Sequence, residues 1–156
     1  MQAPESNKIS TTVDGLPGLV GRTFGPSSWL QITAEDVKAY ADVSRDHNPI
    51  HLDPEAGAKS PFGRCVVHGY LTLSLVVPLM AEVFEVTDMG TGMNYGLDRL
   101  RFPAPVPVGG RIRLSGEVLE TTPVDGGHQI KVGLTFEAEG STKPACVTEL
   151  LLRYYK

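Results

Sequence analysis

The side chains best suited to catalysis lie together in one segment of the sequence, residues 45–69. This segment holds a carboxylate, an amide and three of the four histidines, at Asp46, His47, Asn48, His51 and His68. A carboxylate and an imidazole five residues apart can act on the same water molecule, because each group can both take and give a proton. The spacing of Asp46 and His51 is therefore consistent with general acid and base catalysis on a bound water.

Two other kinds of catalytic site are less well supported by these residues. His47 and His51 have the i, i+4 spacing of helical metal ligands, but Pro49 lies between them and opposes the helix that such a site needs. We expect no metal. Nucleophilic catalysis is disfavoured as well, since the nearby serines lie outside a Gly-x-Ser-x-Gly elbow and Cys65 has no motif that marks a reactive thiol.

A purely structural interpretation of the same residues is also open at this point. Asp46 and Asn48 can form turn hydrogen bonds where a helix ends, while His51 packs as a polar side chain. Local spacing alone does not choose between this interpretation and acid–base catalysis.

Helices are predicted on both sides of the segment and within it. Thr33 can cap a helix over residues 34–44, whose buried stripe is expected to be Val37, Tyr40, Ala41 and Val43. A short helical turn is expected from Pro54 to Lys59. Gly69 opens the most apolar stretch, residues 70–84, which predicts a core helix surrounded by protein.

The second half of the sequence has the period-2 pattern of strands with one buried face. Residues 130–138 alternate strictly between apolar and other side chains, and residues 112–118 repeat the pattern. The Asp125-Gly126-Gly127 turn joins them as a hairpin. Further strands are expected at 29–32, 95–102 and 145–155, so the sequence predicts an α+β fold.

Length, charge and cysteine content restrict the class of protein. A chain of 156 residues predicts a single domain, 1–156, in which residues 1–17 form a loosely held arm. With 14 basic and 18 acidic residues, the scattered charges predict neither a nucleic-acid nor a membrane partner. Two cysteines and no leader-like N-terminus indicate a cytoplasmic protein with reduced thiols.

Three longer motifs identify a family resemblance. RDHNPIHLDP at 45–54, VVHGYLTLSL at 66–75 and RLRFPAPVPVGGRIR at 99–113 resemble the MaoC-like, (R)-specific enoyl-CoA hydratases. The similarity extends over most of Gly18 to Tyr155. It implies the hot-dog fold, a long central helix wrapped by a bent antiparallel sheet, and a homodimer with the two sheets joined edge to edge.

The resemblance also implies a reaction and a site. Water would add to a trans-2-enoyl-CoA thioester to give the (R)-3-hydroxyacyl-CoA, or leave it in reverse, and no cofactor is expected. By resemblance, Asp46 and His51 would activate the water, and the backbone N–H of Gly69 would form the oxyanion hole. The supporting residues would be Asn48, Pro49, His68 and Ser74, and the substrate-binding candidates are Phe62, Arg99 and Arg101.

One residue departs from the family pattern, and several functions remain open. Some hydratases of this family have a helix serine that hydrogen-bonds the catalytic aspartate; that position is Val77 here, and Ser74 lies one turn earlier. We expect His68 to orient the loop by hydrogen bonding. The alternatives to the CoA hydratase are a 3-hydroxyacyl dehydratase acting on acyl carrier protein, a thioesterase, and a non-catalytic acyl-CoA binder.

Overall fold

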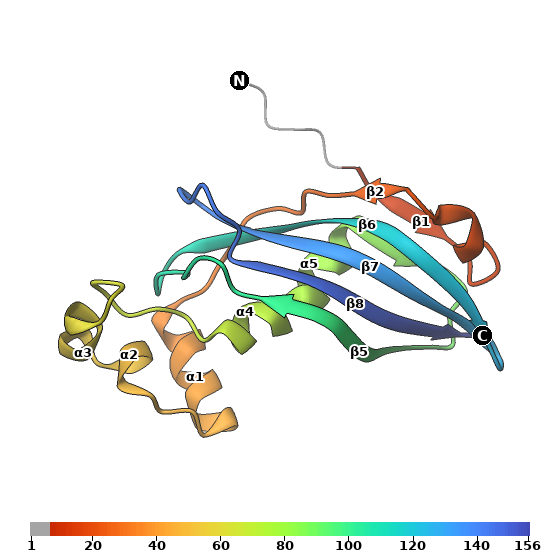
Figure 1. Ribbon diagram of the computed structural model, residues 1–156. Helices are drawn as coiled ribbons and strands as arrows, with labels where there is room; N and C mark the ends of the chain where they lie inside the picture. Colours follow the sequence, from red (N-terminus) through yellow and green to blue (C-terminus); the bar gives the residue numbers. More distant parts are fainter. Residues whose placement is uncertain (1–6) are drawn as a thin grey trace.

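A curved antiparallel sheet wraps around two consecutive helices in the computed structural model, which describes residues 7–156 (Figure 1). The strands are β1 (Ile9–Thr11), β2 (Thr23–Phe24), β3 (Leu30–Gln31), β4 (Phe84–Val86), β5 (Thr91–Arg101), β6 (Arg111–Val124), β7 (Gly127–Ala138) and β8 (Cys146–Tyr155). The helices are the 3₁₀ helix η1 (Leu16–Leu19) and the α-helices α1 (Ala34–Ser44), α2 (Pro49–Leu52), α3 (Pro54–Lys59), α4 (Gly69–Ser74) and α5 (Val76–Val83).

The main sheet is built on the predicted hairpin. Its strand order is β2-β6-β7-β8-β5, and β3 also pairs with β6. Asp125 and Gly126 connect β6 and β7, and Gly126 has the positive φ of 79° that favours glycine in a tight turn. The alternating apolar residues of β7 form one buried face of the strand, as predicted: Ile130, Val132, Leu134, Phe136 and Ala138. The α+β prediction is confirmed.

The predicted central helix is present but interrupted. It consists of α4 and α5, which are separated at Leu75. Pro78 accounts for the break, because it has no N–H to donate to the carbonyl of Ser74 and its ring crowds that carbonyl. The expectation of a helix surrounded by protein is also wrong in part, since Tyr70 is 65% exposed and Val77 is 60% exposed in the single chain.

Two expectations about the N-terminal third require correction. Residues 7–17 are not a loose arm: β1 pairs in parallel with β4, and Ile9, Val13 and Leu16 are buried because they fill the space beside α5 and the sheet. Residues 1–6 of the expected arm lie outside the described residues. In α1 the stripe ends earlier than predicted, with Val43 85% exposed.

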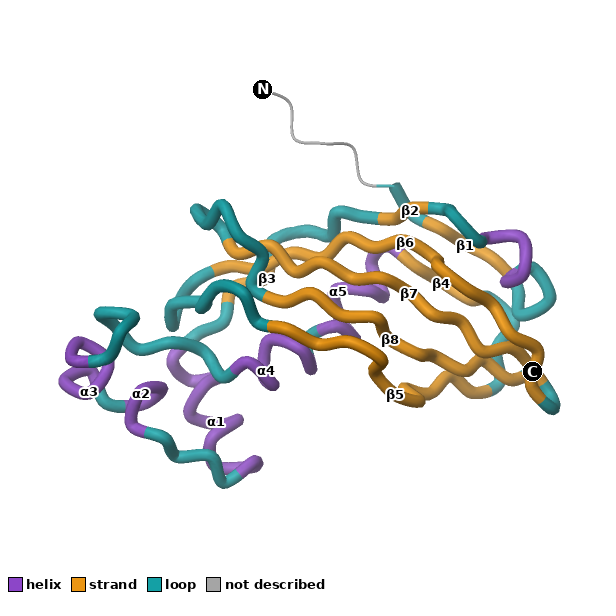
Figure 2. Tube along the Cα trace, viewed as in Figure 1, coloured by secondary structure: helices purple, strands orange, loops and turns teal. Residues whose placement is uncertain are grey.

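The segment that carries the candidate catalytic residues lies beyond one end of the sheet. Helices α1, α2 and α3 gather there, at the amino-terminal end of α4 (Figure 2). The capping box predicted in part at Thr33 is complete, because Thr33 Oγ1 accepts from Asp36 N–H and the Asp36 carboxylate accepts from Thr33 N–H. Among the described residues, no helix has the length and apolar character needed to cross a bilayer.

Candidate active site

A short turn places the Asp46 carboxylate at the end of α1. Arg45 adopts the left-handed conformation, with φ of 64°, and so ends the helix. Asp46 Oδ1 then accepts a hydrogen bond from the backbone N–H of Asn48 at 3.2 Å. Asn48 caps α2 by accepting from the N–H of Ile50, and Pro49 occupies the first helical position. Asn48 and Pro49 therefore hold the start of α2 beside Asp46, and their supporting role in catalysis stays a prediction.

A backbone hydrogen bond fixes the proton on the ring of His51. His51 Nδ1 lies 2.6 Å from the carbonyl oxygen of Val66. Since a carbonyl can only accept, Nδ1 carries the hydrogen, and in the neutral ring Nε2 has the free lone pair. Nε2 of His51 is thus the nitrogen that can take a proton from a bound water.

His68 lies against both members of the expected pair. Its ring is 2% exposed and stacks on His51 with 3.8 Å between ring centroids. Its Nε2 donates to the backbone carbonyl of Asp46 at 3.0 Å, so the hydrogen bond expected between His68 and the loop is present. The ring of Tyr40 covers the same imidazole, with centroids 4.8 Å apart.

The three side chains form one cluster of polar atoms. Asp46, His51 and His68 each contribute an atom, and these atoms lie within 4.8 Å of one another. A water molecule bridges such a separation with two ordinary hydrogen bonds. A shared metal ion would need ring lone pairs that converge, whereas the stacked rings of His51 and His68, 27° from parallel, direct theirs nearly side by side. The geometry favours a water site.

Two neighbouring residues are committed elsewhere. His47 Nε2 lies 3.0 Å from Asp42 Oδ1, away from His51, so the helical pair of metal ligands does not form. The Asp42 pKa is lowered, first by its hydrogen bond from Lys38 and then by the bond to His47. Ser74 Oγ donates to the carbonyl of Leu71 at 2.8 Å, within its own helix, and no hydrogen bond among residues 7–156 joins it to Asp46.

Gly69 is the first residue of α4, directly after His68. The first N–H groups of a helix have no partner inside the helix, and they form a donor end for an anionic oxygen. The ring of Phe102 lies close to the Cα of Gly69, since a methyl group there would approach three ring carbons at 3.1 Å. Phe102 in turn contacts Tyr70 edge to face, at 6.0 Å.

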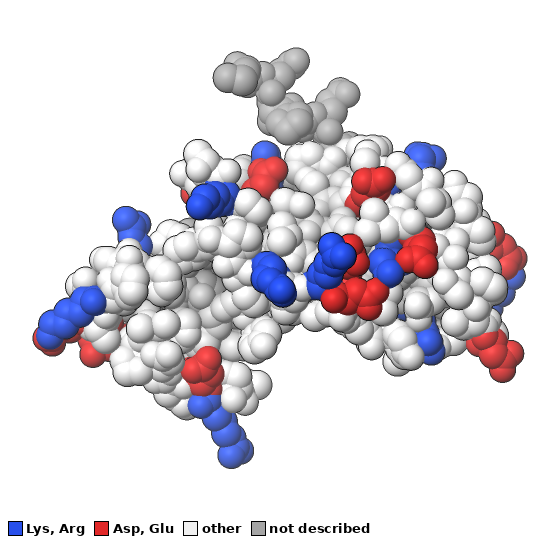
Figure 3. All heavy atoms as spheres, in the orientation of Figure 1, with Lys and Arg blue, Asp and Glu red and all other residues white. Residues whose placement is uncertain are grey.

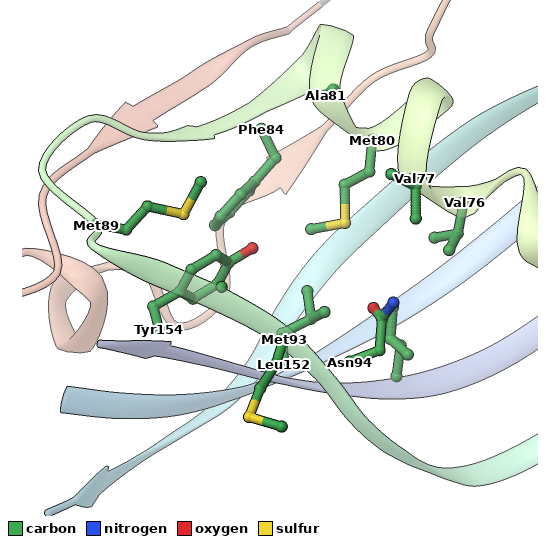
Figure 4. A pocket seen from close by; sticks show the side chains of 12 residues that line it. Val76, Val77, Met80, Ala81, Phe84, Met89, Met93, Asn94, Leu152 and Tyr154 are labelled. Carbon is green, nitrogen blue, oxygen red and sulfur yellow. The ribbon is translucent and has the colours of Figure 1, made fainter. Parts of the chain in front are cut away.

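An apolar cavity lies further along the same helical segment. It measures about 240 Å³, is open to the surface and lies between α5, β4, β5 and β8, with Val77, Met80, Phe84, Met93 and Tyr154 among its lining residues (Figure 4). Three of the four methionines of the chain line it, and their thioether side chains can adapt to different apolar shapes. Burial raises the pKa of the Tyr154 hydroxyl to about 12.

The remaining candidates lie in other grooves. Phe62 lines a groove of about 260 Å³ with Arg64 and Glu139. Arg99 and Arg101 line another beside β8, and Arg99 Nε is 4.0 Å from Glu149. On the face shown in Figure 3, acidic and basic side chains are interspersed. None of the contacts found within residues 7–156 joins Phe62, Arg99 or Arg101 to the Asp46–His51 pair.

Tyr40 is a site residue that the sequence analysis assigned only to packing. Its ring lies against His68, and the pKa of its hydroxyl is raised by burial and then by the charge of Asp46. Tyr40 lies one helical turn before Ser44, at the end of α1 that leads into the catalytic loop. That position in the sequence could have indicated that it lies near the site.

Comparison with known proteins agrees with this fold. The family model described as "MaoC like domain" matches residues 16–139. The chain is 42% identical over 144 residues to 3-hydroxyacyl-thioester dehydratase Z of Mycobacterium tuberculosis, covering 92% of this chain and 95% of that protein. It is 39% identical over 85 residues to the (R)-specific enoyl-CoA hydratase of Aeromonas caviae, covering 54% of this chain and 60% of that one.

The solved structure of R-hydratase PhaJ1 from Pseudomonas aeruginosa, in its unliganded form, superposes with a TM-score of 0.70 and 26% identity, covering 88% of this chain and 82% of that chain. The fold is thus the hot-dog fold of the hydratases. The chain belongs to the MaoC-like family, and with relatives that are named dehydratases and hydratases it is an enzyme of the hydro-lyase class.

Proposed function

We propose that this protein catalyses the reversible, (R)-specific hydration of trans-2-enoyl-CoA to (R)-3-hydroxyacyl-CoA. The observation that carries the proposal is the pairing of a carboxylate and a single-tautomer imidazole at water-bridging distance, Asp46 with His51. The relatives support the substrate class, since one is named for 3-hydroxyacyl thioesters and another for (R)-specific enoyl-CoA.

In the proposed reaction, one water is bound between Asp46 and His51. Its oxygen bonds to C3 of the enoyl thioester, its proton passes to the pair, and the pair returns a proton to C2 on the same face. No covalent enzyme intermediate forms, and the sum is addition of one water across the double bond. The Ser74 contact is not needed for this step, because the Asn48 N–H already orients the Asp46 carboxylate.

The backbone N–H of Gly69 is the proposed oxyanion donor. Attack at C3 moves negative charge onto the thioester oxygen, and a fixed donor at a helix N-terminus stabilises that charge more than it stabilises the ground state. Gly69 directly follows His68, whose ring hydrogen-bonds the main chain of Asp46. The proposed oxyanion donor is therefore connected through His68 to the loop that carries Asp46. In this arrangement the acyl tail extends along α4 toward the methionine-lined cavity.

We also propose that the working unit is a homodimer. β5 is an edge strand of the main sheet, and its apolar side chains Met93, Tyr95 and Leu97 are exposed. Such an edge is a general aggregation hazard that pairing with a second copy removes. Asp46 is exposed in the single chain, and a partner would also shield the site from bulk water.

The test is hydration of crotonyl-CoA, a longer enoyl-CoA and the matching enoyl-acyl carrier protein, followed as loss of the enoyl thioester absorbance. The product is identified with an (R)-specific dehydrogenase. We expect Asp46→Asn and His51→Ala to lower kcat at least ~100-fold with an unchanged circular dichroism spectrum. His47→Ala is the matched control, because His47 lies in the same turn and pairs with Asp42.

Two results would contradict the proposal. Near-normal turnover by folded Asp46→Asn would remove the dyad from the mechanism. Turnover of the carrier-protein substrate alone would replace the CoA hydratase by a 3-hydroxyacyl-carrier dehydratase with the same dyad.

A further inference from the structure

His68 connects three separate elements of the site. It directly precedes α4, its ring lies between Tyr40 of α1 and His51 of α2, and its Nε2–H reaches the carbonyl of Asp46, 22 residues earlier in the chain. One buried side chain therefore contacts the main chain of the carboxylate residue and the ring face of the imidazole residue.

The imidazole is an unfavourable choice for this position on grounds of stability. With Nε2–H committed to a carbonyl, Nδ1 is an acceptor, and it is buried without a hydrogen-bond partner among residues 7–156. A buried polar atom without a partner destabilises the folded state, whereas an apolar ring would fill the same space without that cost. The two contacts with the Asp46–His51 pair give a reason for histidine that stability does not.

We propose that His68 is a positioning residue that sets the distance between Asp46 and His51. This inference rests on the proposed function. The Nε2–H of His68 fixes the main chain at Asp46, and its ring plane fixes the orientation of the His51 ring about the Nδ1–Val66 bond. Removing either contact leaves the Asp46 carboxylate and the His51 imidazole present but changes the distance between them. A misplacement of about 1 Å lowers the rate on the order of 100-fold.

Two variants separate the contacts. His68→Phe keeps a stacking ring and removes the donor, and His68→Gln keeps an amide N–H near the position of Nε2 and removes the ring. We expect kcat to fall about 10- to 100-fold in His68→Phe and less in His68→Gln, with KM within about threefold of wild type in both. We expect the thermal stability of His68→Phe to equal or exceed that of wild type, because the unpartnered Nδ1 is gone.

The matched control is His128→Phe. His128 on β7 also has a buried Nδ1 without a partner, so this variant removes the same kind of atom away from the dyad, and kcat is expected to stay at the wild-type value. If His68→Phe does not fold, His68→Asn takes its place, since its shorter amide does not reach the Asp46 carbonyl. His68→Gln must then exceed His68→Asn in kcat.

A spectroscopic readout distinguishes this inference from the proposed function. In ¹⁵N-histidine spectra, wild-type His51 should show one tautomer with a protonated Nδ1, and His68→Gln, which removes the stacking ring, should show a shifted or mixed tautomer. Turnover by wild type with an unchanged kcat in His68→Phe would overturn the positioning role alone. An effect confined to KM would also overturn it. Absence of turnover in wild type, with the His51 tautomer still dependent on His68, would overturn the proposed function alone.

Discussion

Substituting Gly69 by alanine tests whether the thioester approaches the backbone at the start of α4. The added methyl group would lie 3.1 Å from Cδ2, Cε2 and Cζ of Phe102, where ordinary van der Waals contact begins at 3.4 Å. The ring must therefore move by a few tenths of an ångström. Phe102 is 40% exposed, so it can move without disturbing the core, and the variant is expected to fold.

Gly69→Ala is expected to leave the stability of the protein nearly unchanged and to lower its kcat. Alanine favours a helix over glycine by about 1 kcal/mol, so the free energy of unfolding should stay within about 1 kcal/mol of wild type. If the Gly69 N–H stabilises the thioester oxyanion, the methyl group obstructs that approach, and loss of one such donor costs about 10²- to 10³-fold in kcat. We expect a stable protein with kcat reduced by about that factor, measured by urea unfolding and by crotonyl-CoA hydration.

A double variant separates obstruction from displacement of the ring. Gly69→Ala with Phe102→Leu relieves the contact between the methyl group and the ring and leaves the methyl group beside the N–H. If kcat stays low in the double variant, the methyl group blocks the thioester directly. If wild-type kcat were found in Gly69→Ala alone, the assignment of Gly69 as the oxyanion donor would be refuted.

Four further outcomes are expected. Val77→Phe should fill the methionine-lined cavity and lower kcat/KM for long enoyl thioesters about tenfold while crotonyl-CoA turnover persists; equal losses for both would contradict the proposed path of the acyl tail. Leu97→Lys on the edge strand should convert a dimer to a monomer in light scattering, and a monomeric wild type at micromolar concentration would refute the dimer. Arg45→Gly should raise the free energy of unfolding by about 1 kcal/mol, because it relieves the left-handed conformation; an unchanged urea midpoint would refute this. Burial raises the pKa of Cys146 to about 12 from 9.0, so the unfolded chain ionises first, stability should fall as pH rises through that interval, and Cys146→Val should reduce the slope.

The strands could be predicted from the sequence because their signal is local. Each buried strand face repeats every second residue, and the Asp125-Gly126 turn lies between two such runs. The parallel pair of β1 and β4 could not be predicted in this way. Each of the two strands has three residues, and 72 residues of sequence separate them. The pairing therefore depends on the packed sheet and on α5.

The central helix shows where pattern and stereochemistry compete. Apolar composition predicted one helix over residues 70–84, a stretch that contains Pro78. The proline acts four residues earlier, at the carbonyl of Ser74, and divides the segment into α4 and α5. The Ser74 hydroxyl donates to the carbonyl of Leu71 within α4, and no hydrogen bond among residues 7–156 joins it to Asp46.

The site itself required both a local motif and a distant residue. Spacing could propose Asp46 and His51, since both lie in one turn, but it left open whether they were merely structural. The tautomer of His51 depends on the carbonyl of Val66, and the position of Asp46 depends on the ring of His68. Val66 and His68 both lie at the C-terminal end of residues 45–69. The path of this segment cannot be predicted from a hydrophobic period, because it has none. Because the proposed mechanism depends on which nitrogen of His51 is free, the three-dimensional contacts supply what the spacing could not, a defined tautomer for His51 and a hydrogen bond from His68 to the main chain of Asp46.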